Sequence, residues 1–189
     1  MAVAVVGALL LTGCTPQYTT PDERSHAVGD AVAERLRDVD PQPADLRVTG
    51  SFDGIVVDAA LADLSPDETR DFIETALRVV EESPLGAMPV RLILSHDDAR
   101  SGGGVLEWRG YDPERSERYF AAVQLWLDVL ADPGAKVDQT FEVEATTVHG
   151  SVEVFDDRDL AAYRADLLAA LEQAGYVDPS LEVTPADAP

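Results

Sequence analysis

Helix-start signals recur at nearly equal intervals, and this spacing constrains the fold more than any other feature of the sequence. In Ser65-Pro66-Asp67-Glu68, a serine N-cap, a proline at the first helical position and a glutamate that completes a capping box predict a helix over about 66–82. Similar signals begin at Thr20, Asp112 and Asp156. The predicted helix starts, at 21, 66, 113 and 157, are 45, 47 and 44 residues apart, which indicates a repeated unit.

Strand-like segments follow each of the first three predicted helices. Over 137–145, apolar and polar side chains alternate, as in a strand with one solvated face. Three strand pairs are expected, with a flexible turn from Asp97 to Gly104 in the second pair. The predicted pairs are 45–49 with 54–61, 90–95 with 105–111, and 137–145 with 146–155.

This element order predicts an α+β fold in which an antiparallel sheet carries its helices on one face. The unit helix-strand-strand occurs three times and a helix-strand completes the chain. The stretch over about 52–145 resembles a ferredoxin-like plait by element order, which implies that the flanking pieces could complete a second, packed plait. The sequence from Val39 to Thr49 partly recurs from Val177 to Thr184, either through internal duplication or through frequent reuse of Val, Asp and Pro.

The N-terminus begins with the uncharged apolar run MAVAVVGALLL, which has the length of a signal-peptide core and is too short to span a bilayer. Leu11-Thr12-Gly13-Cys14 resembles the lipobox of bacterial lipoproteins, in which small residues precede a cysteine that is thioether-linked to diacylglycerol before cleavage on its amino side. The resemblance implies lipidation of Cys14 and anchoring in the outer leaflet of the cell membrane. The sequence departs from that pattern because no basic residue precedes the apolar run.

The expected organisation follows from this resemblance. We predict a signal peptide over 1–13, a lipidated cysteine and tether over 14–21, an α+β domain over 22–184 and a disordered tail over 185–189. The alternative is an N-terminal core strand with a buried cysteine. Cys14 is the single cysteine of the chain, so no intramolecular disulfide can form.

The charge balance constrains the partners. Acidic residues outnumber basic ones by 36 to 14, which gives a net charge of −22. Such a charge opposes association with nucleic acid and with anionic lipid headgroups. The two acyl chains of a lipidated Cys14 would hold the protein on the membrane without help from protein charge. We therefore expect a basic protein or an envelope ligand as partner, and no nucleic acid.

Motifs for catalysis or cofactor binding are not found in the sequence. It has no Gly-x-Ser-x-Gly elbow, no Ser-x-x-Lys, no P-loop and no EF-hand loop. We assign no catalytic, cofactor-binding or metal-binding residue. The sequence favours a non-enzymatic binding or accessory module of the cell envelope. The alternative is a divalent-metal-binding protein or metal-dependent hydrolase that uses His96, Asp97 and Asp98 with Asp156 or Asp157. Asp156 is otherwise expected to cap the fourth helix.

Overall fold

The computed structural model describes residues 20–51, 53–83, 89–96, 104–110 and 115–186. Four helices and seven strands alternate in this part of the chain, so the predicted α+β class is confirmed. Their order is α1 (Pro21–Leu36), β1 (Asp45–Ser51), β2 (Gly54–Ala60), α2 (Pro66–Glu81), β3 (Val90–His96), β4 (Gly104–Arg109), α3 (Ser116–Ala131), β5 (Ala135–Val143), β6 (Val148–Val154), α4 (Leu160–Gln173) and β7 (Ser180–Pro185).

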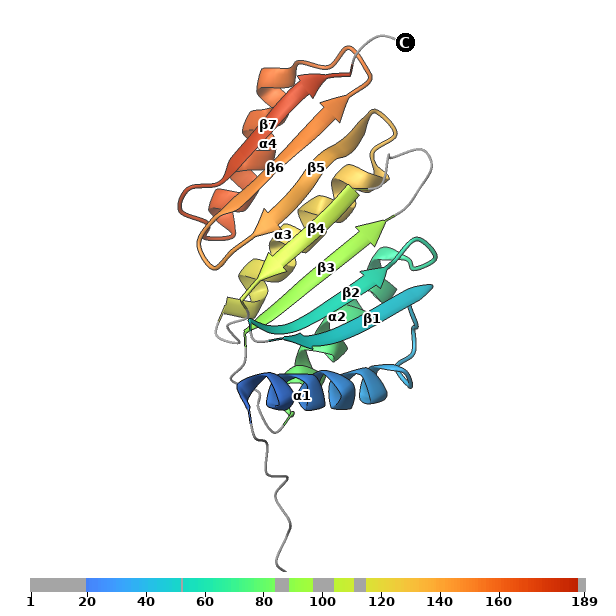
Figure 1. Cartoon of the computed structure of the whole chain (residues 1–189). Helices are drawn as coiled ribbons and strands as arrows, with labels where there is room; N and C mark the ends of the chain where they lie inside the picture. The colour runs from blue at the N-terminus through green and yellow to red at the C-terminus, as the bar shows by residue number, and fades with distance from the viewer. Residues whose placement is uncertain (1–19, 52, 84–88, 97–103, 111–114, 187–189) are drawn as a thin grey trace, which may run out of the picture.

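The strands form one sheet in which spatial order follows chain order, from β1 at one edge to β7 at the other. Strands joined by a short connection are antiparallel, whereas the pairs β2–β3, β4–β5 and β6–β7, each joined through a helix, are parallel. Helices α2, α3 and α4 lie on the same side of the sheet, and α1 lies alongside β1 (Figure 1). The predicted helix-strand-strand unit is therefore the repeating element of the fold.

Two finer expectations differ from the structure. The sheet is mixed rather than antiparallel, because each helix returns the chain so that the next strand runs in the same direction as the last. The strands also do not form two ferredoxin-like plaits, since β2 pairs directly with β3 and β4 directly with β5 in one sequential sheet. Helix crossovers join neighbouring strands here, whereas the plait interleaves them.

The core lies between the sheet and the helices. Alternate residues of the strands, such as Val57, Leu92 and Val152, are fully buried on that side. Trp108 on β4 is one of its two largest fully buried side chains, and its ring stacks on Tyr119 of α3 with centroids 4.3 Å apart. Tyr119 in turn donates a hydrogen bond to the carbonyl of Gly110 at 2.8 Å.

Helix starts explain most of the local structure. Thr20 and Ser65 each form the expected capping box at the start of α1 and α2. Helix α4 is capped by Asp159, which accepts hydrogen bonds from the backbone N–H groups of Ala161 and Ala162, and not by Asp156. The expected signal from Asp112 to Glu114 lies outside the described residues.

Helix α1 approaches β1 through two glycines. A Cβ atom on Gly50 would lie 1.8 Å from the carbonyl oxygen of Ser25, and one on Gly29 would lie 2.4 Å from the backbone nitrogen of Gly50. Any larger residue at either position would therefore overlap backbone atoms. The absence of side chains here allows α1 to seat Val28 and Val32 in the core.

Candidate functional site: the open face of the sheet

The sheet face opposite the helices is the candidate site, and we call it the open face. No helix or strand of the described chain covers it (Figure 1). Strand alternation directs a second set of side chains there, which is mostly polar. The charged members of this set in the described chain are Asp45, Arg47, Asp58, Arg91, Glu107, Arg109, Lys136, Asp138, Glu142, Glu153 and Glu182.

Glu107 is the centre of an ion-pair network across β3, β4 and β5. Its Oε1 accepts a hydrogen bond from Arg109 and is 2.7 Å from Nε of Arg91. Arg109 also lies 3.6 Å from Glu142 on β5. The Glu107 side chain is 9% exposed, whereas both arginines are 47% exposed. A buried carboxylate thus holds two half-exposed guanidinium groups in fixed positions.

The environment of Glu107 shows how firmly this network is held. Burial alone would raise the pKa of Glu107, but the hydrogen bonds from Arg109 and Arg91 outweigh burial and keep the pKa below its ordinary value. The bonds to Glu107 also raise the pKa of Arg109. Glu107 and Arg109 therefore both stay charged at neutral pH.

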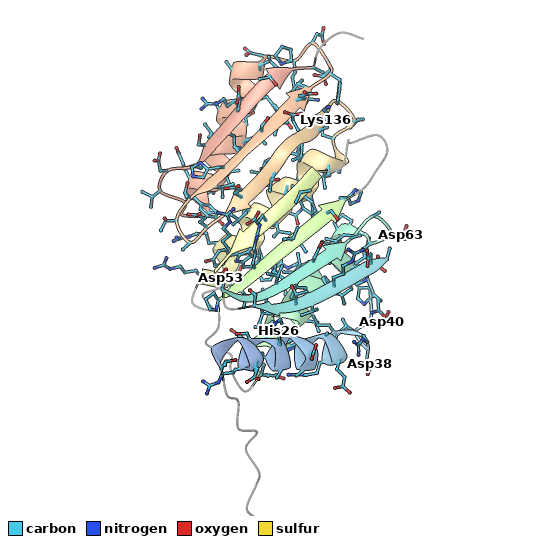
Figure 2. The ribbon with its side chains drawn as sticks, in the orientation of Figure 1. His26, Asp38, Asp40, Asp53, Asp63 and Lys136 are labelled. Carbon is cyan, nitrogen blue, oxygen red and sulfur yellow. The ribbon has the colours of Figure 1, made fainter. Side chains whose placement is uncertain are left out.

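A shallow hollow lies at the end of this network where β2 and β3 begin. Its volume is about 260 Å³, and Arg91, Arg109, Val56, Pro89 and Asp53 are among its lining residues. Figure 2 shows Asp53 at this end of the sheet and Lys136 at the opposite end, where β5 begins. The open face therefore has both a hollow and ordered charged groups, which are features of docking surfaces.

The far part of the open face is more acidic. Lys136 pairs with Glu153 at 2.7 Å, which raises the pKa of the lysine. Asp138 accepts a hydrogen bond from Ser151 at 3.3 Å and lies near enough to Lys136 to help raise the pKa of that lysine, but it forms no ion pair in the described chain. Within the same residues, Asp58 and Glu182 have no ion pair. Several carboxylates are therefore available to a cationic partner.

Removing the charge of Glu107 should destabilise the fold in a pH-dependent way. The pKa of Glu107 is lower in the folded state, so the carboxylate stabilises the protein at pH values above the ordinary glutamate pKa. This stabilisation is lost as the pH falls through the pKa of the folded state. We expect Glu107→Gln to lower the free energy of unfolding by about 1–3 kcal/mol at pH 7. Urea denaturation at pH 7 and pH 3 measures this effect. The difference in free energy of unfolding between Glu107→Gln and wild type should be smaller at pH 3 than at pH 7.

The matched control is Glu182→Gln on β7, which removes one carboxylate from the same face where no ion pair is broken. We expect it to stay within about 0.5 kcal/mol of wild type at both pH values. Equal effects of the two substitutions, or no narrowing at pH 3, would contradict the network described for Glu107.

Arg158 and two aspartates form a second cluster, which joins two connections of the fold. Asp132, before β5, and Asp156, after β6, both bind the guanidinium of Arg158. Hydrogen bonds from Arg158 hold the pKa of Asp156 and of Asp132 below their ordinary values. The cluster links the α3–β5 connection to the β6–α4 connection. Because Asp156 binds Arg158, Asp159 is the residue that caps α4.

The metal hypothesis is not tested by these contacts. His96 is the last residue of β3, and its Nδ1 is buried without a hydrogen-bond partner in the described chain. Asp97 and Asp98 lie outside the described residues, as does the predicted turn from Asp97 to Gly104 except for Gly104 itself, which begins β4. Among the residues that the structure places, no group of three His, Cys, Asp or Glu side chains could hold a metal ion.

Cys14 and the predicted signal peptide also lie outside the described residues. Helix α1 begins at Pro21 and β7 reaches Pro185, so the ordered elements extend one residue into the predicted tether and one into the predicted tail. None of the helices placed by the structure is both long enough and apolar enough to cross a membrane.

No protein-family model matches this chain, and no curated protein matches its sequence.

Proposed function

We propose that the protein is a lipid-anchored, extracytoplasmic binding module of the cell envelope, without enzymatic activity, that docks a basic partner protein on its open face. The observation that carries the proposal is the uncovered sheet face, which spans β1 to β7. The lipobox resemblance at Cys14 supports the location, and the net charge of −22 supports a cationic partner.

The open face is suited to docking because its charged groups are already ordered. Glu107 fixes Arg91 and Arg109, and Lys136 is held by Glu153. Side chains ordered before binding lose less conformational entropy when a partner arrives. Asp58 and Glu182, which have no ion pair in the described chain, supply the attraction for basic residues.

Site-specific photocrosslinking in the native envelope tests this proposal. A photoreactive amino acid replaces Asp58 on β2 in one variant and Glu81, an exposed residue of α2, in the matched control. We expect the variant at Asp58 to crosslink a discrete basic protein at low salt and to lose most of that product at high salt. No product from Asp58, or the same product from Glu81, would overturn the assignment of the open face.

The metal hypothesis has its own test. Specific thermal stabilisation by a divalent ion at micromolar concentration, lost in His96→Ala, would replace the binding-module proposal with a metal-dependent function. Equal, small effects of Ca²⁺, Mg²⁺ and Zn²⁺ at millimolar concentration would indicate charge screening of an acidic protein and exclude a specific site.

A further inference from the structure

We infer that the outer edge of β1 accepts an extended segment of a partner protein, which adds a strand to the sheet and places a carboxylate against Arg37. The inference concerns the sheet edge and does not depend on the open face. Strand addition at a sheet edge is a general mode of peptide binding, in which backbone hydrogen bonds supply affinity and flanking side chains supply specificity.

The position of β1 in the repeat leaves its outer edge without a strand partner, although α1 closes the end of this edge at Gly50. In each later unit the first strand, β3, β5 or β7, pairs with the last strand of the preceding unit. No described strand occupies that place beside β1. The side chains of Leu46 and Val48 are accordingly half-buried, whereas Leu92 and Leu94 of β3 are fully buried.

The backbone groups on this edge follow from the hydrogen-bond pattern. Ile55 and Leu61 direct their N–H groups to the β3 side, bonding Pro89 and Ser95. Alternation along β2 therefore directs the even-numbered residues toward β1, where they meet the odd-numbered residues of β1 in the antiparallel register. The N–H and C=O groups of Leu46 and Val48 consequently point outward, away from the sheet.

A groove runs beside these two residues, and we call it the β1 groove. Its volume is about 620 Å³, and it lies between the second half of α1 and β1. This volume is within the range of about 300–1,000 Å³ for ligand pockets. Its lining residues include Ala33, Arg37, Asp45, Leu46, Arg47 and Val48.

The charge of the β1 groove is opposite to that of the protein. Arg37 and Arg47 line it with one carboxylate, Asp45, which is paired with Arg47 at 2.9 Å. Arg37 has no side-chain hydrogen bond or ion pair within the described residues. Asp38 and Asp40 follow α1 at the same end of the molecule (Figure 2), but do not line the groove. An unpaired guanidinium beside open backbone groups fits a segment that carries a carboxylate.

A second copy of the chain fits this edge poorly. Helix α1 already lies alongside β1 and closes its end at Gly50, so a second sheet with its own α1 would meet this helix. The β7 edge is also blocked. The backbone N–H of Ala186 donates a hydrogen bond to the carbonyl of Val154 on β6, so the backbone groups of the odd-numbered β7 residues face outward. On this outer edge, Arg164 already donates a hydrogen bond to the carbonyl of Leu181, and Pro185 has no N–H. The geometry thus favours a single extended segment.

NMR titration of the full chain carrying Cys14→Ala tests the inference. The probe is a blocked peptide of sequence TVEVT, compared with blocked TVQVT and TVKVT and with TVTV bearing a free C-terminal carboxylate. We expect TVEVT to shift and protect the amides of Leu46 and Val48, and TVKVT to bind at least about tenfold more weakly. The free-carboxylate peptide shows whether a side-chain or a terminal carboxylate meets Arg37.

Two substitutions and a control make the test specific. Ala33→Glu adds bulk to the groove and places a carboxylate four residues before Arg37. An acidic and a basic residue at this spacing stabilise a helix, so we expect the fold to be retained and peptide binding to be lost. Arg37→Gln should weaken TVEVT by about tenfold, and Arg78→Gln on α2 should leave it unchanged. Absent binding, shifts centred elsewhere, equal affinity for TVEVT and TVKVT, or protection of the same amides by dimerisation would overturn the inference.

Discussion

Replacing Trp108 with alanine should lower the free energy of unfolding by about 3–5 kcal/mol. The indole is 1% exposed, stacks on Tyr119 and meets Phe120 edge-on with ring centroids 6.2 Å apart. Its Nε1 donates a hydrogen bond to the carbonyl of Gly110 at 3.2 Å. The substitution removes this bond and leaves a cavity between β4 and α3, near the middle of the sheet.

Urea denaturation followed by far-ultraviolet circular dichroism measures this effect without relying on tryptophan fluorescence. Val177→Ala is the matched control, because this apolar side chain is 80% exposed and should change stability by no more than about 0.5 kcal/mol. A loss below about 1 kcal/mol for Trp108→Ala would contradict the packing described between β4 and α3.

Introducing a side chain at Gly50 should displace α1 from the edge of the sheet. A Cβ atom there would lie 1.8 Å from the carbonyl oxygen and 2.4 Å from the carbonyl carbon of Ser25. These are backbone atoms and cannot turn aside as a side chain would, so we expect Gly50→Val to cost about 3 kcal/mol, the upper end of the usual range for overpacking. Hydrogen exchange should show loss of protection throughout α1.

The neighbouring substitution Thr49→Val controls for the change in strand propensity, since Thr49 is exposed and pairs with Val56 in the same ladder. We expect α1 to keep its protection in that variant. Normal protection of α1 in Gly50→Val would show that the helix does not depend on close contact with β1.

Local sequence signals predicted the elements better than their arrangement. The capping boxes at Thr20 and Ser65 formed as expected, because their partners lie three residues away in the chain. The strand pairs were also recovered, since their connections are short. Strict alternation over 137–145 did not reveal the register shifts between Val137 and Gln139 and between Gln139 and Glu142.

Features that depend on distant residues were missed for a physical reason. Sequential and interleaved strand orders have the same element sequence, and the choice depends on where each helix packs. The network of Glu107 requires the registers of β3, β4 and β5 to be known, although the neighbouring charges of Glu107 and Arg109 on one strand face were visible in the sequence. Gly29 and Gly50 gave no signal, because only their contact explains them.

Intact-mass analysis and membrane fractionation test the central claim most directly. The chain would be expressed in a bacterium with the lipoprotein machinery, with an upstream basic start added, and wild type compared with Cys14→Ala. We expect wild type to begin at Cys14, to carry diacylglycerol and to sediment with membranes, and the variant to lose both the lipid and the membrane association. An unmodified wild-type chain that retains residues 1–13 and stays out of the membrane fraction would contradict the account.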